Sequence, residues 1–227
     1  MALLRGDAVH SRVSAGVRTH SQSVLPMVQE LLAAAGITLK ECDAVAFGSG
    51  PGSFTGVRTA CGVAQGLAFG AGLPVVPVVT LDAMALACHQ QLGLPAGAEV
   101  LAVLDARMGE VYWAQYRLAD GAAPATVLPP VLSAPEGVQP QGSPVACGNG
   151  LSAYAGAFTA AALSRSHADI MPHAEHIARL AALAFAAGRM VTAAEAQPLY
   201  LRNKVAYTQA ERRAMASDSG KAPAADA

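Results

Sequence analysis

The chain has 227 residues, a length that suits one large domain or two small lobes. Apolar residues make up 53% of it and charged residues 14%, a composition that can bury a sizeable core and excludes a disordered chain. The net charge is −1 and the arginines are scattered, which argues against autonomous binding of RNA phosphates. Gly, Pro or charge interrupts every apolar run, and the first residues lack a signal-peptide pattern, so we expect a cytoplasmic protein with no membrane span.

The first part of the chain alternates strands and helices after an opening hairpin. Gly6-Asp7 is a turn dipeptide between two short strand-like runs and predicts a β-hairpin. Apolar residues at helical spacing predict a helix over 23–35, with Pro26 in its first turn and Gly36 just past its end. The pattern then predicts a strand at 43–47, a helix at 55–69, a strand at 73–79 and a helix at 80–91.

The composition turns to Gly, Pro and Ala near residues 93–97, where we place the boundary between a first lobe (1–96) and a second lobe (97–207). The second lobe is predicted to hold an antiparallel pair at 100–106 and 110–118, strands at 126–132 and 144–148, and a helix over 173–187 that Gly188 terminates. Residues 208–227 are polar, small and low in aromatics, and we expect a disordered tail. The alternation favours an α/β architecture.

The four cysteines are far apart and form no CxxC pair, so we expect reduced thiols and no zinc or redox motif. They are Cys42, Cys61, Cys88 and Cys147.

A glycine-rich segment, residues 48–56, joins a predicted strand to a predicted helix. Glycines let a ligand approach the backbone, and a helix N-terminus favours anions, so the segment is a candidate phosphate loop. It matches neither the Walker pattern nor GxGxxG, and a tight turn with Ser53 or Thr55 as the helix N-cap is the alternative interpretation. The candidate phosphate-binding residues are Gly50, Gly52, Ser53, Thr55 and Arg58.

Glycines recur every fourth residue on the helix that follows, at Gly62, Gly66 and Gly70, and would form a ridge without side chains. Such a ridge lets another backbone come close, although packing on the chain's own sheet would explain it too. The opposite face is also apolar, and a helix that is apolar nearly all round is buried on more than one side. We therefore predict that this helix serves both the core and an interface.

Hydrolytic or metal chemistry finds little support in the sequence. There is no GxSxG or HExxH motif, and His173 and His176 lack a third ligand nearby and are expected to be solvated at the start of a helix. Asp105 and Glu110 flank a predicted turn and could act as an acid–base pair, but carboxylates at turns more often cap the turn or face water. We predict no metal site.

Residues 50–58, GPGSFTGVR, resemble the signature of the TsaB (YeaZ) family. The resemblance continues through Leu-Pro-Met-Val at 25–28, Asp-Ala-Arg at 105–107 followed by Val-Tyr at 111–112, and Pro-Leu-Tyr-Leu-Arg at 198–202, and it covers residues 2–206 in order. It implies a degenerate form of the two-lobed actin/hexokinase/Hsp70-like fold (ASKHA, ribonuclease H-like).

The resemblance also implies a function. Members of the family pair with a catalytic subunit, TsaD, and work with an ATPase, TsaE, in the transfer of a threonylcarbamoyl group to N6 of adenosine 37 in tRNA. We therefore expect a non-catalytic scaffold subunit that homodimerises when alone, meets tRNA only through the complex and has no cofactor of its own. The pairing resembles a bundle of the first two helices, which implies interface residues Val24, Leu25, Val28, Leu32, Gly62, Gly66 and Gly70.

Two alternatives remain open: an M22-like peptidase, and a regulator that holds ATP or ADP at the partner interface through the glycine-rich segment. The catalytic relative carries a metal-binding HxxxH, and Thr80 and Met84 stand at the equivalent positions here. Neither a threonine hydroxyl nor a thioether suits a hard divalent ion. Asp105-Ala106-Arg107 stands where a glycine-rich phosphate turn would lie and leaves less room for a phosphate. We therefore predict no catalytic residue.

The start of the chain departs from the family pattern. Relatives begin with an additional strand before the hairpin, and this chain begins with Met1-Ala2-Leu3-Leu4 where the family typically reads Val-Ala-Leu-Leu. We expect that Met1 corresponds to a GTG valine codon and that the first strand of the fold lies upstream of it. Without that strand the first lobe would have unpaired backbone groups and poor solubility.

Overall fold

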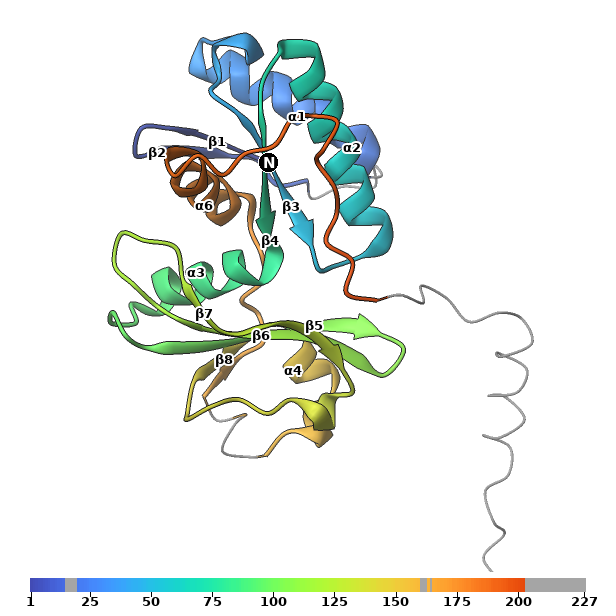
Figure 1. The fold of residues 1–227 in the computed structure, drawn as a ribbon, viewed down its shortest axis with the longest axis vertical. Helices are drawn as coiled ribbons and strands as arrows, with labels where there is room; N and C mark the ends of the chain where they lie inside the picture. Colours follow the sequence, from blue (N-terminus) through green and yellow to red (C-terminus); the bar gives the residue numbers. More distant parts are fainter. Residues whose placement is uncertain (15–19, 160–162, 164, 203–227) are drawn as a thin grey trace, which may run out of the picture.

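A computed structural model describes residues 1–14, 20–159, 163 and 165–202. Figure 1 shows two halves, one above the other: an upper half with α1, α2 and α6 around two short strand pairs, and a lower half built on a larger sheet. The tail predicted at 208–227 lies outside the described residues. None of the helices described here is long and apolar enough to cross a bilayer.

The predicted hairpin is confirmed as β1 (Ala2–Arg5) paired antiparallel with β2 (Ala8–Ser11). The first helix, α1 (His20–Ala35), starts three residues earlier than predicted, so Pro26 lies inside the helix and the prediction of a first-turn proline is wrong. The earlier start was hidden because the added residues are polar and extend no apolar stripe. Pro26 is exposed, so water can reach the backbone carbonyl that it leaves unpaired.

A parallel β-α-β unit follows the short 3-10 helix η1 (Leu39–Glu41). Strand β3 (Val45–Gly50) and strand β4 (Val75–Val79) pair in parallel, and α2 (Phe54–Ala71) connects them. Strand β3 extends three residues beyond its predicted end, so part of the glycine-rich segment is strand. Helix α3 (Thr80–Leu92) then ends at Gly93, whose φ of +58° closes the helix in the left-handed region.

The lower half is a five-stranded sheet in the order β7-β6-β5-β8-β9. Its central strand β5 (Glu99–Arg107) pairs antiparallel with β6 (Glu110–Arg117), as predicted. It also pairs in parallel with β8 (Val145–Cys147), a strand whose neighbour the sequence did not predict. The outer strands are β7 (Ala125–Ser133) and β9 (Ser166–His167), and β9 is too short to give a sequence signal. Between β7 and β9 lie η2 (Pro135–Gly137), α4 (Gly150–Ala153) and η3 (Ala155–Ala157).

The two faces of this sheet are covered by different helices. Met84 and Cys88 of α3 pack with Val100 and Tyr116 on one face, and Leu151 of α4 packs with the other. All four cysteines are unpaired, which confirms the prediction of free thiols, and Cys61, Cys88 and Cys147 are buried.

Helix α6 (Ala174–Ala186) returns to the upper half, where Leu180 and Ala181 pack with Val76 and Val78 of β4. A backbone bridge between Val75 and Val191 then ties the chain after α6 to the edge of β4. The lobe ranges 1–96 and 97–207 stay a prediction. They place α6 in the second lobe, whereas α6 packs in the upper half.

Gly148 offers a test of how tightly the lower half is packed. Its φ is +107°, and a Cβ there would lie 2.2 Å from the carbonyl oxygen of Val103 and 2.5 Å from the methyl group of Met84. We expect Gly148→Ala to lower the free energy of unfolding by on the order of 3 kcal/mol, because backbone cannot yield as a flexible side chain can. The measurement is urea unfolding followed by circular dichroism.

Gly156→Ala is the matched control, since a Cβ at Gly156 would have nothing within 4 Å. We expect this variant to stay within about 0.5 kcal/mol of the parent. Equal midpoints for the two variants would contradict the packing described here.

Candidate functional site

Helix α2 has one face fixed in the core of the upper half. Val57, Cys61, Ala64 and Ala68 are its buried residues, and the last three pack in a cluster that includes Phe47 of β3. This confirms that the apolar face opposite the glycines is buried.

The opposite face of α2 carries the glycine ridge, Gly62, Gly66 and Gly70. All three glycines are exposed, and a Cβ added at any of them would meet nothing within 4 Å. The alternative that the ridge packs on the chain's own sheet is therefore wrong. Beside it, Phe69 leaves 83% of its surface exposed. The ridge is an open, apolar surface, and its use as an interface stays a prediction.

A hollow of about 400 Å³ lies at the ridge, between α2 and the 3-10 turn after α1. It is lined by Thr38, Leu39, Lys40, Gly66, Leu67, Gly70 and Ala71. The missing side chains of Gly66 and Gly70 help to create this hollow, so the ridge is a site into which a side chain of another protein can fit.

Helix α1 supplies the other predicted interface residues. Leu31 is its buried anchor, at 3% exposure. Leu25 is 51% exposed, and Val24, Val28 and Leu32 are half-buried, so each keeps apolar surface accessible. These positions are compatible with the predicted interface but do not by themselves identify an occupant.

The glycine-rich segment ends in a helix cap. The Oγ of Ser53 accepts a hydrogen bond from the Gly56 N–H at 3.4 Å, so Ser53 is the N-cap of α2 and Thr55 lies exposed in its first turn. The interpretation as a capped strand–helix turn is confirmed for Ser53.

A strap formed by residues 196–202 covers this turn. Leu199 donates its N–H to the carbonyl of Ser49 at 2.7 Å, and a Cβ on Gly50 would lie 2.9 Å from the Leu199 carbonyl. The strap therefore explains Gly50 by close backbone packing. Phosphate or nucleotide binding at this segment stays a prediction, with Gly52, Ser53 and Thr55 left outside that contact.

Arg58 also has a partner within the chain. Its guanidinium lies 3.6 Å from the centre of the Phe54 ring, and its Nε donates to the hydroxyl of Tyr200 at 2.8 Å. Arg58 thus holds the strap to the first turns of α2 through stacking and a hydrogen bond. A phosphate would have to compete with both contacts.

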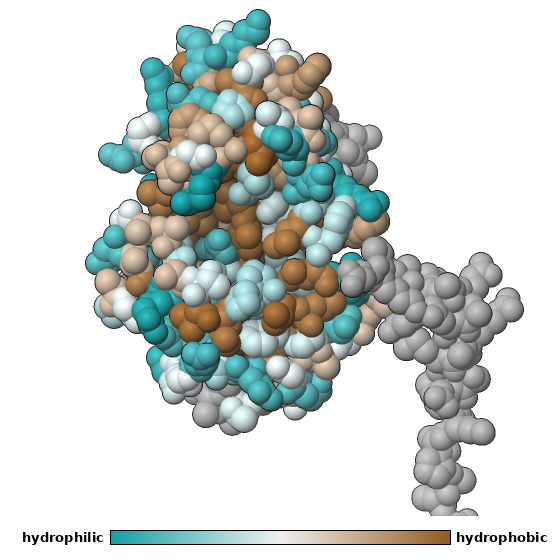
Figure 2. Space-filling view, in the orientation of Figure 1, coloured by the Kyte–Doolittle hydropathy of each residue, from teal (hydrophilic) through white to brown (hydrophobic). Residues whose placement is uncertain are grey.

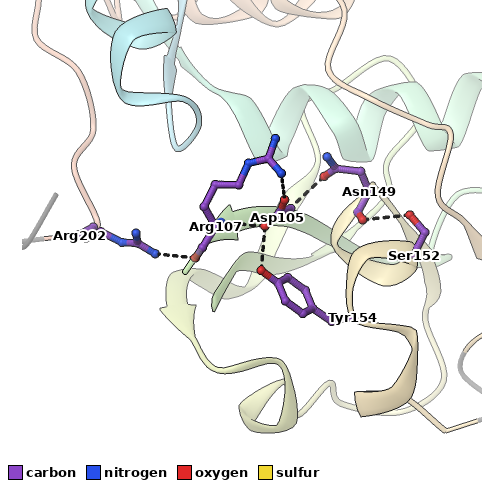
Figure 3. A network of polar contacts seen from close by, with 6 residues as sticks. All are labelled: Asp105, Arg107, Asn149, Ser152, Tyr154 and Arg202. Carbon is purple, nitrogen blue, oxygen red and sulfur yellow. Dashed lines mark hydrogen bonds and ion pairs between the residues drawn. The ribbon is translucent and has the colours of Figure 1, made fainter. Parts of the chain in front are cut away.

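The turn between β5 and β6 is organised by the carboxylate of Asp105 (Figure 3). Its Oδ1 accepts from the Arg107 N–H at 2.7 Å and from the Tyr154 hydroxyl at 3.0 Å, and its Oδ2 pairs with the Arg107 guanidinium at 2.8 Å. The backbone N–H of Asp105 donates to Oδ1 of Asn149 at 3.0 Å. Asp105 therefore caps a turn. Burial of the Tyr154 hydroxyl, together with its hydrogen bond to the Asp105 carboxylate, raises the pKa of Tyr154.

Glu110 is engaged as well. Arg202, at the end of the strap, donates to the Glu110 carboxylate and to the carbonyl oxygen of Arg107, the latter at 3.2 Å. Both carboxylates of the candidate acid–base pair are thus held by side chains of the same chain. Sequence reasoning missed the strap; its signals were the aromatic Tyr200 and the cation Arg202 in an otherwise plain segment.

The resemblance places Thr80 and Met84 at the positions of the catalytic relative's metal ligands, and this equivalence stays a prediction. Met84 is fully buried and Thr80 is half-buried. Among the residues that the structure describes, no group of three or more His, Cys, Asp or Glu side chains is placed to hold a metal.

His173 caps α6 by accepting from the Glu175 N–H, and His176 is buried, so the prediction that both histidines are solvated is wrong for His176. His176 is buried because α6, which carries it, packs in the upper half.

Comparisons with known proteins agree with this architecture. A profile of the family described as "TsaD: tRNA N6-adenosine threonylcarbamoyltransferase" matches residues 7–210. The "tRNA threonylcarbamoyladenosine biosynthesis protein TsaB" of Escherichia coli K12 is 39% identical over 213 residues, 91% of each chain. The Haemophilus influenzae protein of that name is also 39% identical, over 90% of this chain and 89% of its own.

The chain belongs to the TsaB (YeaZ) family. Two Pseudomonas aeruginosa structures support this: YeaZ, with a TM-score of 0.76 at 36% identity, and a protein described as similar to the peptidase YeaZ, with a TM-score of 0.78 at 37% identity. Each matches 88% of this chain, and the matches cover 92% and 93% of those chains. The prediction of an α/β fold of the actin/hexokinase-like type is confirmed.

His176 gives this family member a pH-dependent stability. Burial lowers the pKa of His176, with His173 and Arg179 acting in the same direction and Glu175 opposing them. The unfolded state therefore binds a proton more readily, and stability falls as the pH drops below about 6.5 and levels off below the folded-state pKa. We expect His176→Gln to lessen the change in unfolding free energy between pH 7 and pH 5.

The measurement is urea unfolding at both pH values. His173→Gln is the control for a second histidine at the same helix start and should retain most of the pH dependence. An unchanged pH dependence in His176→Gln would contradict the assignment.

Proposed function

We propose that this chain serves in the biosynthesis of tRNA threonylcarbamoyladenosine as a scaffold subunit that binds a TsaD-like catalytic subunit. The observation that carries the proposal is the glycine ridge of α2, which is open along its length while the other face of the same helix is fixed in the core. The family membership of the chain and the names of its relatives supply the pathway.

The ridge is costly for an isolated chain. Each glycine inside a helix destabilises it by about 1 kcal/mol relative to alanine. At Gly62, Gly66 and Gly70 no contact within the chain requires the missing side chain. A partner helix that approaches closely along the ridge gives the three glycines a reason to be there, and the hollow beside Gly66 gives that partner a place for one side chain.

The chemistry belongs to the partner in this proposal. Met84 offers a buried thioether where the catalytic relative has a metal ligand, and Asp105 and Glu110 are each engaged by an arginine. The same engagement disfavours the peptidase alternative, although a structural relative is described as similar to a peptidase. With a net charge of −1, the chain meets tRNA through the assembled complex, which includes a TsaE-like ATPase. The free subunit homodimerises through the same ridge.

A charge on the ridge should abolish the pairing. We expect Gly66→Glu to weaken binding of a TsaD-like partner by at least about 100-fold, because a carboxylate would be buried in the interface without a counter-charge. Binding is measured by calorimetry with the two purified subunits, and co-elution on a sizing column gives a second readout.

Ala153→Glu is the matched control, since Ala153 is an exposed small residue on a helix of the lower half. It should bind as the parent does. Gly66→Ala should weaken binding less than Gly66→Glu while stabilising the free subunit. Unchanged co-elution of Gly66→Glu would contradict the proposed interface.

Depletion of the protein from its host tests the pathway itself. We expect threonylcarbamoyladenosine to disappear from tRNA nucleosides analysed by mass spectrometry, because the partner loses its support. Re-expression of the parent chain should restore the nucleoside, and re-expression of Gly66→Glu should not. Undiminished threonylcarbamoyladenosine after full depletion would exclude a role in this pathway.

A further inference from the structure

Two cysteines that are far apart in the sequence meet in the core of the lower half. Cys88 lies near the end of α3, and Cys147 is the last residue of β8. Both are fully buried, at 0% exposure, and both belong to the apolar cluster that packs α3 on the sheet. Two thiols from separate elements therefore share one small region of the core, and the proposed scaffold role uses neither of them.

Helix α3 and strand β8 are in close contact at this point. The Cys147 thiol donates to the carbonyl of Met84 at 3.9 Å, and Met84 stands one helical turn before Cys88 on the same face of α3. The Cys147 thiol also interacts directly with the Cys88 thiol. A Cβ on the next residue, Gly148, would lie 2.5 Å from the methyl group of Met84, so the strand packs directly against the helix.

A buried cysteine is by itself an ordinary core residue, because its thiol packs as a small apolar group. Cys61 is an example in the upper half, where its buried thiol donates to the carbonyl of Ala196 at 3.4 Å. Cys88 and Cys147 differ from Cys61 because each of their thiols has the other thiol as a neighbour. Two adjacent thiols can form a covalent bond, which a single buried thiol cannot do.

The two thiols differ in acidity. The hydrogen bond from Cys147 lowers the pKa of Cys88, against the effect of burial. The same hydrogen bond, together with burial, raises the pKa of Cys147. Because the thiolate is the form that oxidants attack, Cys88 is the thiol that reacts first, and Cys147 is the thiol that then reacts with the oxidised sulfur.

The edge of the lower sheet gives a small oxidant a route to this region. Strand β9 has two residues and pairs with β8 at Ala146 and Cys147. So short an edge strand can open locally without unfolding the rest of the sheet, and its opening uncovers the edge of β8. A peroxide is small enough to enter through such an opening.

We propose that Cys88 and Cys147 form a reversible disulfide on exposure to hydrogen peroxide, and that this bond locks α3 onto the lower sheet. The peroxide oxidises the Cys88 thiol to a sulfenic acid and releases one water. The Cys147 thiol then attacks that sulfur, and a second water leaves as the S–S bond forms. Two S–H bonds are broken in total, and their two electrons reduce the O–O bond of the peroxide. A dithiol reductant restores both thiols by exchange.

The test treats the purified chain with hydrogen peroxide, alkylates the remaining free thiols and identifies linked peptides by mass spectrometry. Chymotrypsin is the protease of choice, because cleavage at Phe69 separates Cys61 from Cys88. We expect one linked pair, Cys88 with Cys147, whose mass is two hydrogens below the sum of the reduced peptides. The melting temperature should rise by at least about 5 °C, because the bond closes a loop of about 60 residues in the unfolded chain. Dithiothreitol should reverse both changes.

Three variants provide the controls. Cys88→Ala and Cys147→Ala should each lose the linked pair and the rise in melting temperature. Cys61→Ala removes a buried thiol that has no thiol partner, and it should keep both. The proposal is overturned if Cys88 and Cys147 stay unlinked in the treated parent chain, if they are linked and the melting temperature does not rise, or if Cys61→Ala abolishes the rise. The readout on the parent chain does not depend on how the variants fold, and no measurement contains the partner protein, so a failure here is separate from a failure of the proposed function.

Discussion

The structure of the upper half depends on one helix, which packs in the core with one face and forms an open surface with the other. Helix α2 is built from small residues: its alanines allow close packing on β3, and its glycines leave a flat outer surface. Larger residues on the inner face would push the helix off the strands, and larger residues on the outer face would remove the ridge and its hollow. Figure 2 shows further apolar surface across the middle of one face, between the upper and lower halves.

The strap formed by residues 196–202 contacts α2 at two places. Ala196 is buried, and its carbonyl accepts a hydrogen bond from Gln65 at 2.9 Å, while Tyr200 holds Arg58 two turns earlier on α2. Arg202 then continues the same segment to the β5–β6 turn of the lower half. A segment of seven residues therefore connects the glycine-rich turn, α2 and the lower sheet, and it determines what can approach that turn.

The sequence predicted most elements because their signals are local. Alternating strands, helical spacing and glycines after helices are visible within a dozen residues, as for the hairpin at Gly6 and for α3 before Gly93. The glycine ridge was predicted for the same reason. The role of Gly50 could not be predicted in this way, because it depends on the contact with Leu199, about 150 residues later in the chain. The burial of His176 likewise depends on α6 returning to a half that its position in the sequence does not suggest.

The glycine-rich segment shows why one motif can support two interpretations. Glycine is required wherever a backbone comes close, whether that backbone approaches a phosphate or another part of the chain. At Gly50 the neighbour is the Leu199 carbonyl, and at the ridge there is no neighbour within the chain. Glycine therefore permits a contact within the chain at Gly50 and leaves an open surface at Gly62, twelve residues later. Only the second kind is informative about a partner.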